Sequence, residues 1–250
     1  MKQSLKSISL VYNLFFQPGE VVEIRGLGLS GKNPAWEGWA RNGGVVYGYF
    51  NNAADFEKAA KALDAAGAAG VYFTLNPCTP ELIARAHNRL IAAGKRPLTS
   101  DANIKRIRWF IIDIDPKRPA GISSSDAKLE AARETGKKIV KWLREKLGFP
   151  AFIGACSGNG YHILYRLPDS EPSETVSGSK GLIANALRAL NERFGNQMVN
   201  IDVTVHNAAR IWKCYGTVAR KGDHTKERPH RRSYLFDKNP KRLSEVLVLP

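Results

Sequence analysis

The chain has 250 residues, of which 43% are hydrophobic and 9% aromatic, and 38 Lys and Arg residues against 23 Asp and Glu give a net charge of +15. A chain this apolar can bury enough surface to offset the entropy of ordering, which excludes intrinsic disorder. No apolar run approaches the roughly 20 residues of a membrane span, and the N-terminal residues lack the pattern of a secretory signal. We therefore expect a soluble, cytoplasmic protein with no membrane partner.

The cysteines and the net charge narrow the class of protein further. Cys78, Cys156 and Cys214 stand far apart, without a CxxC pair and without a Cys/His spacing of the zinc-binding kind. We expect neither disulfides nor zinc, in keeping with a reducing cytosol. The excess of positive charge indicates a polyanionic partner, most often nucleic acid, although charge also serves solubility.

The first part of the chain, to about residue 97, is predicted to form a small αβ module. Asn52 can cap a helix over 53–66, and Pro80 can open a second helix over 80–93. Apolar and alternating runs indicate strands near 21–25, 45–50 and 71–75.

Residues 98–250 are predicted to form a second module with a different order of strands and helices. The patterns indicate a β-α-β-β-α-β order, over 108–115, 126–148, 151–155, 161–167, 180–194 and 199–205. This is the order of a ferredoxin-like or RRM-like antiparallel sheet, which leaves one face free for a site. The polar stretch 171–179 is expected to be a surface loop. The expected fold class is therefore α+β, with an αβ module (1–97) packed on an RRM-like module (98–250).

Two carboxylates are predicted to lie side by side on the strand over 108–115. Asp113 and Asp115 are one residue apart, so the period of two places both on one face, with Cα atoms about 6.6 Å apart. They repel by roughly 2 to 3 kcal/mol at an effective dielectric constant of about 20, which calls for a cation. Oxygen ligands favour Mg²⁺ or Mn²⁺ over zinc. In the alternative interpretation the pair only ends a strand and is neutralised by Lys117 and Arg118.

A third acid, Asp202, lies between Ile201 and Val203 in the last predicted strand. A single aspartate in a strand is more often an edge residue or a turn former. If this strand lies beside the one that carries Asp113, the three carboxylates converge and can hold two metal ions about 4 Å apart. Such an arrangement suits phosphoryl transfer.

The segment SGNG joins two predicted strands. Gly158, Asn159 and Gly160 can adopt the positive φ angles of a tight hairpin, and in the plain interpretation this is only a turn. Ser157 and His162, however, flank backbone amides that could hold an anion. Together with the acids before and after them in the chain, they favour a functional role.

Basic residues are concentrated between Lys213 and Arg242, where ten Lys or Arg accompany three acids. The Gly, Pro and His residues of this segment predict a loop and hairpin, whose Arg and Lys can contact the phosphates of a template or a nucleotide. Interleaved aromatic residues argue against a disordered tail. They can be core residues or can stack on bases, and we expect core: Trp212, Tyr215, Tyr234 and Phe236.

Three motifs follow one another along the chain: DID at 113–115, SGNGYH at 157–162, and NID at 200–202 followed by NAARIWKCYGTVARKG and RPHR. In this order they resemble the archaeo-eukaryotic primase superfamily, and more narrowly the primase-polymerase (prim-pol) domains of bacteria, phages and plasmids. The stretches VVEIRG, GYF and VYFTLNP also look like that family. The resemblance thus covers nearly the whole chain.

The resemblance implies a prim-pol fold with the site in the cleft between the modules, and a role for each residue of the motifs. The catalytic metal ligands, for two Mg²⁺ or Mn²⁺ ions, would be Asp113, Asp115 and Asp202. The nucleotide-binding residues would be Ser157, Asn159, His162, Arg210, Lys221 and Asn76. The residues that contact nucleic acid would be Lys213, Arg220, His230, Arg231 and Arg232.

The sequence therefore predicts a DNA primase-polymerase that joins NTPs or dNTPs on a single-stranded DNA template, in replication of the phage or plasmid type. A helicase is a further candidate partner, because relatives often carry one fused C-terminally and this sequence lacks the P-loop pattern GxxxxGK[ST]. One alternative is a non-catalytic, RRM-like single-strand binder or replication initiator that uses the basic segment alone. A metal-dependent nuclease would share the acids but would not explain the SGNGYH turn.

Overall fold

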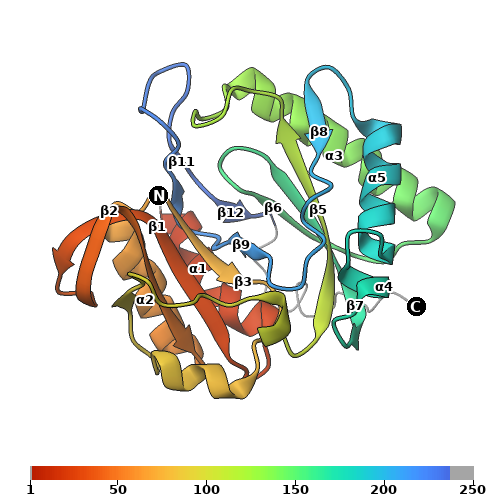
Figure 1. The fold of residues 1–250 in the computed structure, drawn as a ribbon. Coiled ribbons are helices and arrows are strands. Elements are labelled where there is room, and N and C mark those ends of the chain that lie inside the picture. Colours follow the sequence, from red (N-terminus) through yellow and green to blue (C-terminus); the bar gives the residue numbers. More distant parts are fainter. Residues whose placement is uncertain (1, 237–250) are drawn as a thin grey trace.

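The computed structural model describes residues 2–236, with side chains from Ile8 onward. This part of the chain has the predicted α+β class, with two five-stranded, mostly antiparallel sheets and helices packed against them (Figure 1). No helix in the described part is long and apolar enough to cross a bilayer. The elements of the first half are α1 (Lys2–Phe15), β1 (Val22–Asn33), β2 (Trp36–Phe50), α2 (Ala53–Ala65), β3 (Gly70–Thr74), η1 (Pro80–Arg85), β4 (Ile91–Ala92) and η2 (Asp101–Asn103).

The second half contains the longest helix and the strands of the second sheet. Its elements are β5 (Ile107–Pro116), α3 (Asp126–Leu147), β6 (Ile153–Cys156), β7 (Tyr161–Ser170), α4 (Glu174–Ser177), α5 (Leu182–Phe194), β8 (Val199–Ile201), β9 (Ile211–Lys213), β10 (Val218–Ala219), β11 (Arg231–Arg232) and β12 (Tyr234–Leu235).

The first sheet has the strand order β4-β2-β1-β3-β9 and grows from a long hairpin. β1 and β2 pair from Val22 opposite Phe50 to Asn33 opposite Trp36. α1 and α2 pack together on this sheet, where aromatic rings from both helices and from β3 form much of its core.

Most predicted elements of this half are present. The three predicted strands correspond to parts of β1, β2 and β3, and the side-chain oxygen of Asn52 caps α2 by accepting from the Asp55 N–H at 2.9 Å. The sequence analysis did not assign α1. Its buried residues Ile8, Val11 and Phe15 recur at helical spacing, which is the signal that could have identified it.

The helix predicted over 80–93 is wrong. Only Pro80–Arg85 is helical, as a 3₁₀ helix, and Ile91–Ala92 form β4. Asn88 interrupts the helical course with a φ of +48°, and the backbone beyond it pairs in parallel with β2. Pairing with the open edge of a sheet thus overrides the local helix propensity of this segment.

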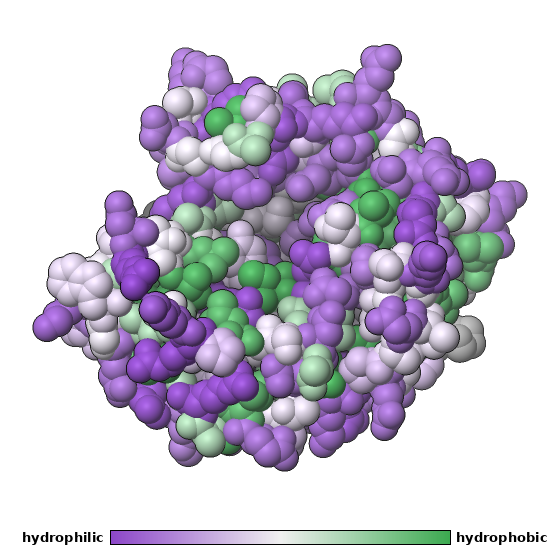
Figure 2. Space-filling view, viewed as in Figure 1, coloured by the Kyte–Doolittle hydropathy of each residue, from purple (hydrophilic) through white to green (hydrophobic). Residues whose placement is uncertain are grey.

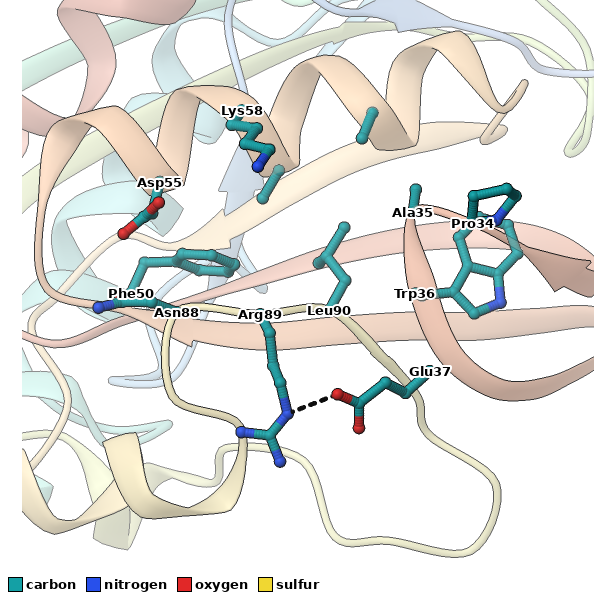
Figure 3. A pocket seen from close by; sticks show the side chains of 12 residues that line it. Pro34, Ala35, Trp36, Glu37, Phe50, Asp55, Lys58, Asn88, Arg89 and Leu90 are labelled. Carbon is teal, nitrogen blue, oxygen red and sulfur yellow. Dashed lines mark ion pairs between the residues drawn. The ribbon is translucent and has the colours of Figure 1, made fainter.

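A cavity of about 550 Å³ lies between α2, β2 and the segment before β4 (Figure 3). Arg89 and Glu37 form an ion pair there, with an N···O distance of 3.0 Å. Its other charged residues are Asp55 and Lys58, so acidic and basic side chains balance.

The second sheet has the strand order β12-β6-β7-β5-β8. The strands β6-β7-β5-β8 are arranged as the predicted β-α-β-β-α-β order requires, and every pair is antiparallel. α3 and α5 lie together on the outer face of this sheet (Figure 1). The stretch predicted as a surface loop over 171–179 contains the four-residue helix α4.

The last predicted strand, 199–205, is shorter than expected, because β8 ends at Ile201. Asp202 Oδ1 accepts hydrogen bonds from the N–H and the hydroxyl of Thr204, at 2.8 and 2.7 Å, and so turns the chain. The chain then crosses to the first sheet, where β9 pairs with β3. The module boundary near residue 97 stays a prediction. Because of this crossover, β9, a strand from the second half of the chain, belongs to the first sheet.

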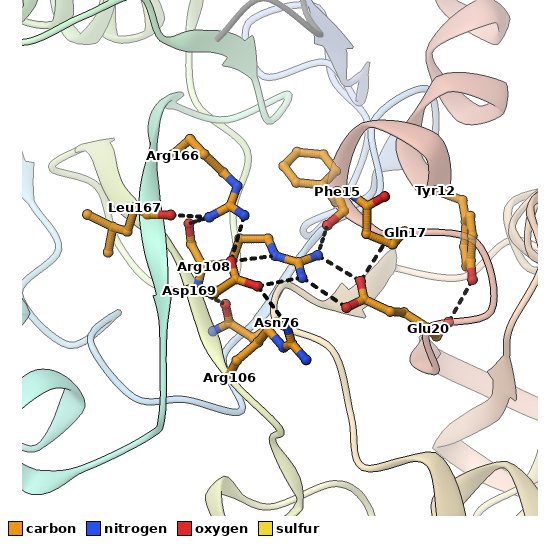
Figure 4. A network of polar contacts seen from close by, with 10 residues as sticks. All are labelled: Tyr12, Phe15, Gln17, Glu20, Asn76, Arg106, Arg108, Arg166, Leu167 and Asp169. Carbon is orange, nitrogen blue, oxygen red and sulfur yellow. Dashed lines mark hydrogen bonds and ion pairs between the residues drawn. The ribbon is translucent and has the colours of Figure 1, made fainter. Parts of the chain in front are cut away.

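A buried arginine links distant segments of the chain (Figure 4). Arg108, on β5, has a side chain that is 4% exposed and donates to Glu20 at 2.7 and 2.9 Å and to Asp169 at 3.1 and 2.9 Å. It also donates to the carbonyl of Phe15 at the end of α1. Burial by itself would raise the pKa of Glu20 and of Asp169, but hydrogen bonds from Arg108 hold both pKa values below their usual range.

Replacing Arg108 by Met should lower the free energy of unfolding by roughly 3 to 5 kcal/mol, because two carboxylates would remain partly buried without their main partner. Arg106→Met is the matched control: Arg106 also pairs with Asp169, but its side chain is 32% exposed. The control should change stability by about 0 to 1 kcal/mol. Urea denaturation measures both, and equal effects would contradict the assignment.

The same network predicts a dependence of stability on pH. Because the pKa values of Glu20 and Asp169 are lowered in the fold, their contribution is complete above their unfolded pKa values, near about 4, and is lost as the pH falls through the folded ones. Stability of the wild type should therefore decline below about pH 5. The decline should be shallower in Arg108→Met, and a wild-type slope in that variant would contradict this account.

Candidate functional site

A cavity of about 140 Å³ lies between the two sheets, where β3, β5, β7 and β9 meet the loops that follow β6 and β8. In the view of Figure 2, the molecular surface is hollowed near its middle, and hydrophilic residues lie above the hollow. Nine of the predicted site residues line this cavity: Asp113, Asp115, Asp202, Ser157, Asn159, His162, Arg210, Lys213 and Lys221.

The carboxylates of Asp113 and Asp115 lie on one face of β5 and line the cavity together. Asp113 Oδ1 is buried without a hydrogen-bond partner, and it lies 3.5 Å from His162 Nε2. Desolvation within the cavity and the charge of Asp113 raise the pKa of Asp115 to about 6, although Arg118, which forms an ion pair with Asp115 at 3.6 Å, and Lys221 act in the opposite direction. The pair therefore carries negative charge that its protein neighbours do not fully compensate.

Asp202 joins the cavity through main-chain pairing. Its N–H donates to the carbonyl of Asp113 at 2.9 Å, which continues the β8–β5 ladder by one bond. Its Oδ1 is engaged by Thr204. Within residues 2–236, no three His, Cys, Asp or Glu side chains are grouped closely enough to hold a metal ion. Asp113 and Asp115 thus form the centre of the candidate cation site, and Asp202 lies on its wall.

The donors of the cavity fit a hard divalent cation. Carboxylate oxygens are preferred ligands of Mg²⁺ and Mn²⁺. Oδ1 of Asp113 is a buried acceptor without a hydrogen-bond donor, so a cation could bind it. A cation here would also offset the repulsion that raises the pKa of Asp115. Asp113 and Asp115 are the residues that would hold it.

His162 is buried against two aromatic residues that the sequence analysis did not place in the site. Its ring lies 4.1 Å from the ring of Trp212, and its Nδ1 is 2.8 Å from the hydroxyl of Tyr215. Trp212 Nε1 donates to the same hydroxyl, also at 2.8 Å. Burial raises the pKa of Tyr215 well above its usual value, so this hydroxyl keeps its proton.

This chain of hydrogen bonds favours one tautomer of His162. The Tyr215 oxygen accepts from Trp212, and Nδ1 of His162 is the acceptor within reach of the Tyr215 hydroxyl, so we assign the Tyr215 proton to the bond with Nδ1. With Nδ1 as the acceptor, the neutral ring carries its proton on Nε2, which is the nitrogen nearest Asp113. His162 is therefore held as a hydrogen-bond donor toward the cavity.

The turn between β6 and β7 is closed by its own side chains. Ser157 Oγ accepts from the amides of Gly160 and Asn159, at 2.9 and 3.3 Å, so these amides are engaged within the turn rather than open to an anion. Of the three residues expected to allow positive φ, only Gly158 has it, at +97°. Asn159 Oδ1 accepts from the Ser124 N–H at 2.8 Å, whereas Asn159 Nδ2 is buried without a partner and remains a free donor.

Three basic residues line the cavity in different states. Lys221 is exposed, and Arg210 donates to the carbonyl of Thr204 while its Nε has no partner. Lys213 is buried: it donates to the Val218 carbonyl at 2.9 Å, and burial lowers its pKa to about 7. Lys221 and Arg210 are thus the cavity's available cations for phosphate.

Two further arginines, predicted to contact nucleic acid, lie outside the cavity and hold the fold. Arg220 and Arg232 donate to opposite oxygens of Asp64 at the end of α2, at 3.0 and 2.7 Å. Asp64 also accepts from the Val218 N–H at 2.9 Å. Burial by itself would raise the pKa of Asp64, but these hydrogen bonds lower it. Asp64 anchors the basic segment to the first module, a role that only its distant partners reveal.

His230, Arg231 and Asn76 also lie outside the lining of the cavity. Arg231 donates to the Ser124 carbonyl at 2.7 Å, and His230 Nε2 is 2.7 Å from the Gly222 carbonyl. Asn76 is buried, where it accepts from the Arg108 N–H at 2.9 Å. Their predicted roles in binding stay predictions. The end of the basic segment, 237–242, lies outside the described residues.

No family model matches the chain, and none of the curated proteins is similar to it in sequence. Among solved structures, it is similar to the crystal structure of primase RepB′, with 14% identity and a TM-score of 0.44 over 96% of this chain. The chain spans 60% of the length of that neighbour. A likeness this weak does not indicate a function for the chain.

Replacing Tyr215 by Phe should allow both neutral tautomers of His162, because Nδ1 loses the hydrogen bond from the Tyr215 hydroxyl. Imidazole ¹⁵N shifts of labelled protein should change from a pure Nε2–H pattern to a mixture of tautomers. The control is Tyr49→Phe, which removes a buried hydroxyl bonded to Thr99 and leaves the contacts of His162 in place, so the His162 pattern should stay that of the wild type. An unchanged pattern in Tyr215→Phe would show that the hydroxyl does not orient the ring.

Proposed function

We propose that the protein is a metal-dependent nucleotidyltransferase of the primase-polymerase type, which extends or starts strands on a single-stranded DNA template from NTPs or dNTPs. The observation that carries the proposal is the under-compensated carboxylate pair of Asp113 and Asp115, which faces His162 and the cations Lys221 and Arg210 in one cavity. Acids that bind a divalent cation beside donors that bind phosphate are the parts that phosphoryl transfer requires.

In this proposal, the acidic side chains of the cavity bind the metal ion and its hydrogen-bond donors bind phosphate. Asp113 and Asp115 would hold Mg²⁺ or Mn²⁺, with Asp202 supporting them from the end of β8. A bound divalent cation lowers the pKa of the attacking hydroxyl and stabilises the leaving pyrophosphate. His162, held with its proton on Nε2, would donate to a phosphate oxygen. Asn159 Nδ2 is a second neutral donor without a partner in the protein.

The positive side chains at the edge of the cavity favour a triphosphate over a neutral substrate. Lys221 is exposed there, and its positive charge acts to lower the pKa of Asp115. Arg210, on the loop before β9, keeps an unpartnered Nε. A triphosphate that approaches the acids would be repelled by them, so both the cations that line the cavity and a divalent cation held by the acids would be needed to offset that repulsion.

The double variant Asp113→Asn with Asp115→Asn should lower nucleotide incorporation on a primed single strand by on the order of a thousandfold, since several kcal/mol of charge stabilisation would be lost. Calorimetry should show that Mn²⁺ binding with a nucleoside triphosphate is lost as well. Glu192→Gln, an exposed change on α5, is the control and should leave both unchanged. Incorporation at the wild-type rate by the double variant would refute the metal assignment, and shortening of a labelled strand without nucleotides would indicate a nuclease instead.

His162→Ala should raise KM for the nucleotide by roughly 10- to 100-fold, because a hydrogen bond to a charged phosphate contributes about 1.5 to 3 kcal/mol. The control is His87→Ala, which removes an exposed histidine before β4. Steady-state incorporation measures both variants. A KM equal to that of the wild type would remove His162 from the phosphate site.

A further inference from the structure

A second cleft lies on the opposite face of the second sheet from the carboxylate cavity. It has a volume of about 760 Å³ and is bounded by α3 on one side and by β6, β7 and β12 on the other. Tyr161 and Ile163 of β7 line it, whereas the ring of His162 between them projects to the other face, toward Asp113. We name this space the α3 cleft. The alternation of β7 places it back to back with the candidate active site.

Aromatic rings form the floor of the α3 cleft. Phe236 is 49% exposed and Tyr234 is 37% exposed, so the expectation that both are core residues is wrong. The Phe236 ring centroid lies 5.5 Å from that of Tyr161 and 5.9 Å from that of Tyr234. Phe236 is also fixed by its backbone: its N–H donates to the Gly154 carbonyl at 2.9 Å, and its ring occupies the space where a Cβ of Gly154 would lie. Exposed rings held in this way are platforms for stacking.

Basic side chains of α3 form the facing wall. Arg133, Lys137, Lys141 and Arg144 line the cleft and follow one another at intervals of three or four residues, so their charges form a row about 5 to 6 Å apart along the helix. Glu145 is the one acid in the lining that the structure describes. Arg133 and Lys137 form ion pairs with neighbouring glutamates on the exposed helix. Such pairs contribute little in water and can yield to a phosphate.

We propose that the α3 cleft binds single-stranded nucleic acid, with bases stacked on Tyr234 and Phe236 and with phosphates along the row of α3 cations. A row of cations matches a polymer that repeats its negative charge, and exposed rings match bases that are not hidden in a duplex. The cavity beside α2 has no such combination, because its acidic and basic residues balance (Figure 3). The proposal uses neither Asp113 nor Asp115, and it stands whether or not the protein transfers nucleotides.

The test is the affinity of the full chain for a fluorescein-labelled oligothymidine of about 12 residues, measured by anisotropy in EDTA and without nucleotides. Under these conditions the carboxylate cavity can make no metal-dependent contribution. Lys137→Glu with Lys141→Glu should raise Kd at least about tenfold, and should reduce the slope of log K against log salt by about 1.4, for two lost phosphate contacts on a single strand.

A matched control separates this site from bulk charge. Lys32→Glu with Lys61→Glu makes the same change of net charge at exposed lysines of the first half, and Lys61 is paired with a glutamate on its helix as Lys137 is. The control should change Kd by less than about threefold. Equal losses in the two double variants, or no loss in the cleft variant, would overturn the proposal.

Two further measurements complete the test. With wild-type protein, photo-crosslinking to an oligonucleotide that carries 5-iododeoxyuridine should label Tyr234 or Phe236, and crosslinks confined to other segments would overturn the proposal. Vesicles of phosphatidylserine and phosphatidylcholine test an anionic membrane as the alternative partner. Cleft-dependent sedimentation with vesicles, together with unchanged binding of oligothymidine by the cleft variant, would assign the surface to lipid. Loss of incorporation in the Asp113 and Asp115 variants with retained oligothymidine binding would leave this proposal intact.

Discussion

Antiparallel pairing of β5 along both of its edges is the constraint on which the candidate site depends. On one edge Asp113 lies opposite His162, and on the other the ladder with β8 ends where the Asp202 N–H meets the Asp113 carbonyl. A slip of one residue would turn both carboxylates of β5 under α3 and bring its isoleucines into the cavity. Burial of Ile112 and Ile114 on the helix side therefore sets the register that assembles the acids.

Buried acidic residues are paired with positive groups in the rest of the fold, but less completely at the candidate site. Glu20 and Asp169 share the guanidinium of Arg108, and Asp64 is held between two arginines, so these carboxylates are compensated within the chain. Asp113 instead keeps a buried oxygen with no hydrogen-bond partner, beside a second carboxylate whose pKa is raised to about 6. Compensation is local to each acid, and its incompleteness at Asp113 is the observation from which we propose a cation site.

Positive charge is divided in the same way between structural and available groups. Arg108, Arg220 and Arg232 are engaged by carboxylates of distant segments, and Lys213 is buried. The exposed Lys221 lines the carboxylate cavity, and four basic residues of α3 line the cleft on the other side of the second sheet: Arg133, Lys137, Lys141 and Arg144. The net charge of the chain therefore overstates the number of cations that a polyanion could meet.

Periodicity and capping were sufficient to predict the β-α-β-β-α-β order, the N-cap of α2 and the common face of Asp113 and Asp115, because each depends on neighbours within a few residues. The tertiary structure decided what depends on distant partners. The open edge of β2 pairs with Ile91 and Ala92, so that the end of the segment predicted as helix over 80–93 is a strand, and the hydroxyl of Tyr215 bonds to Nδ1 of His162. Such outcomes follow from which remote segments meet, and a local pattern carries no information on that.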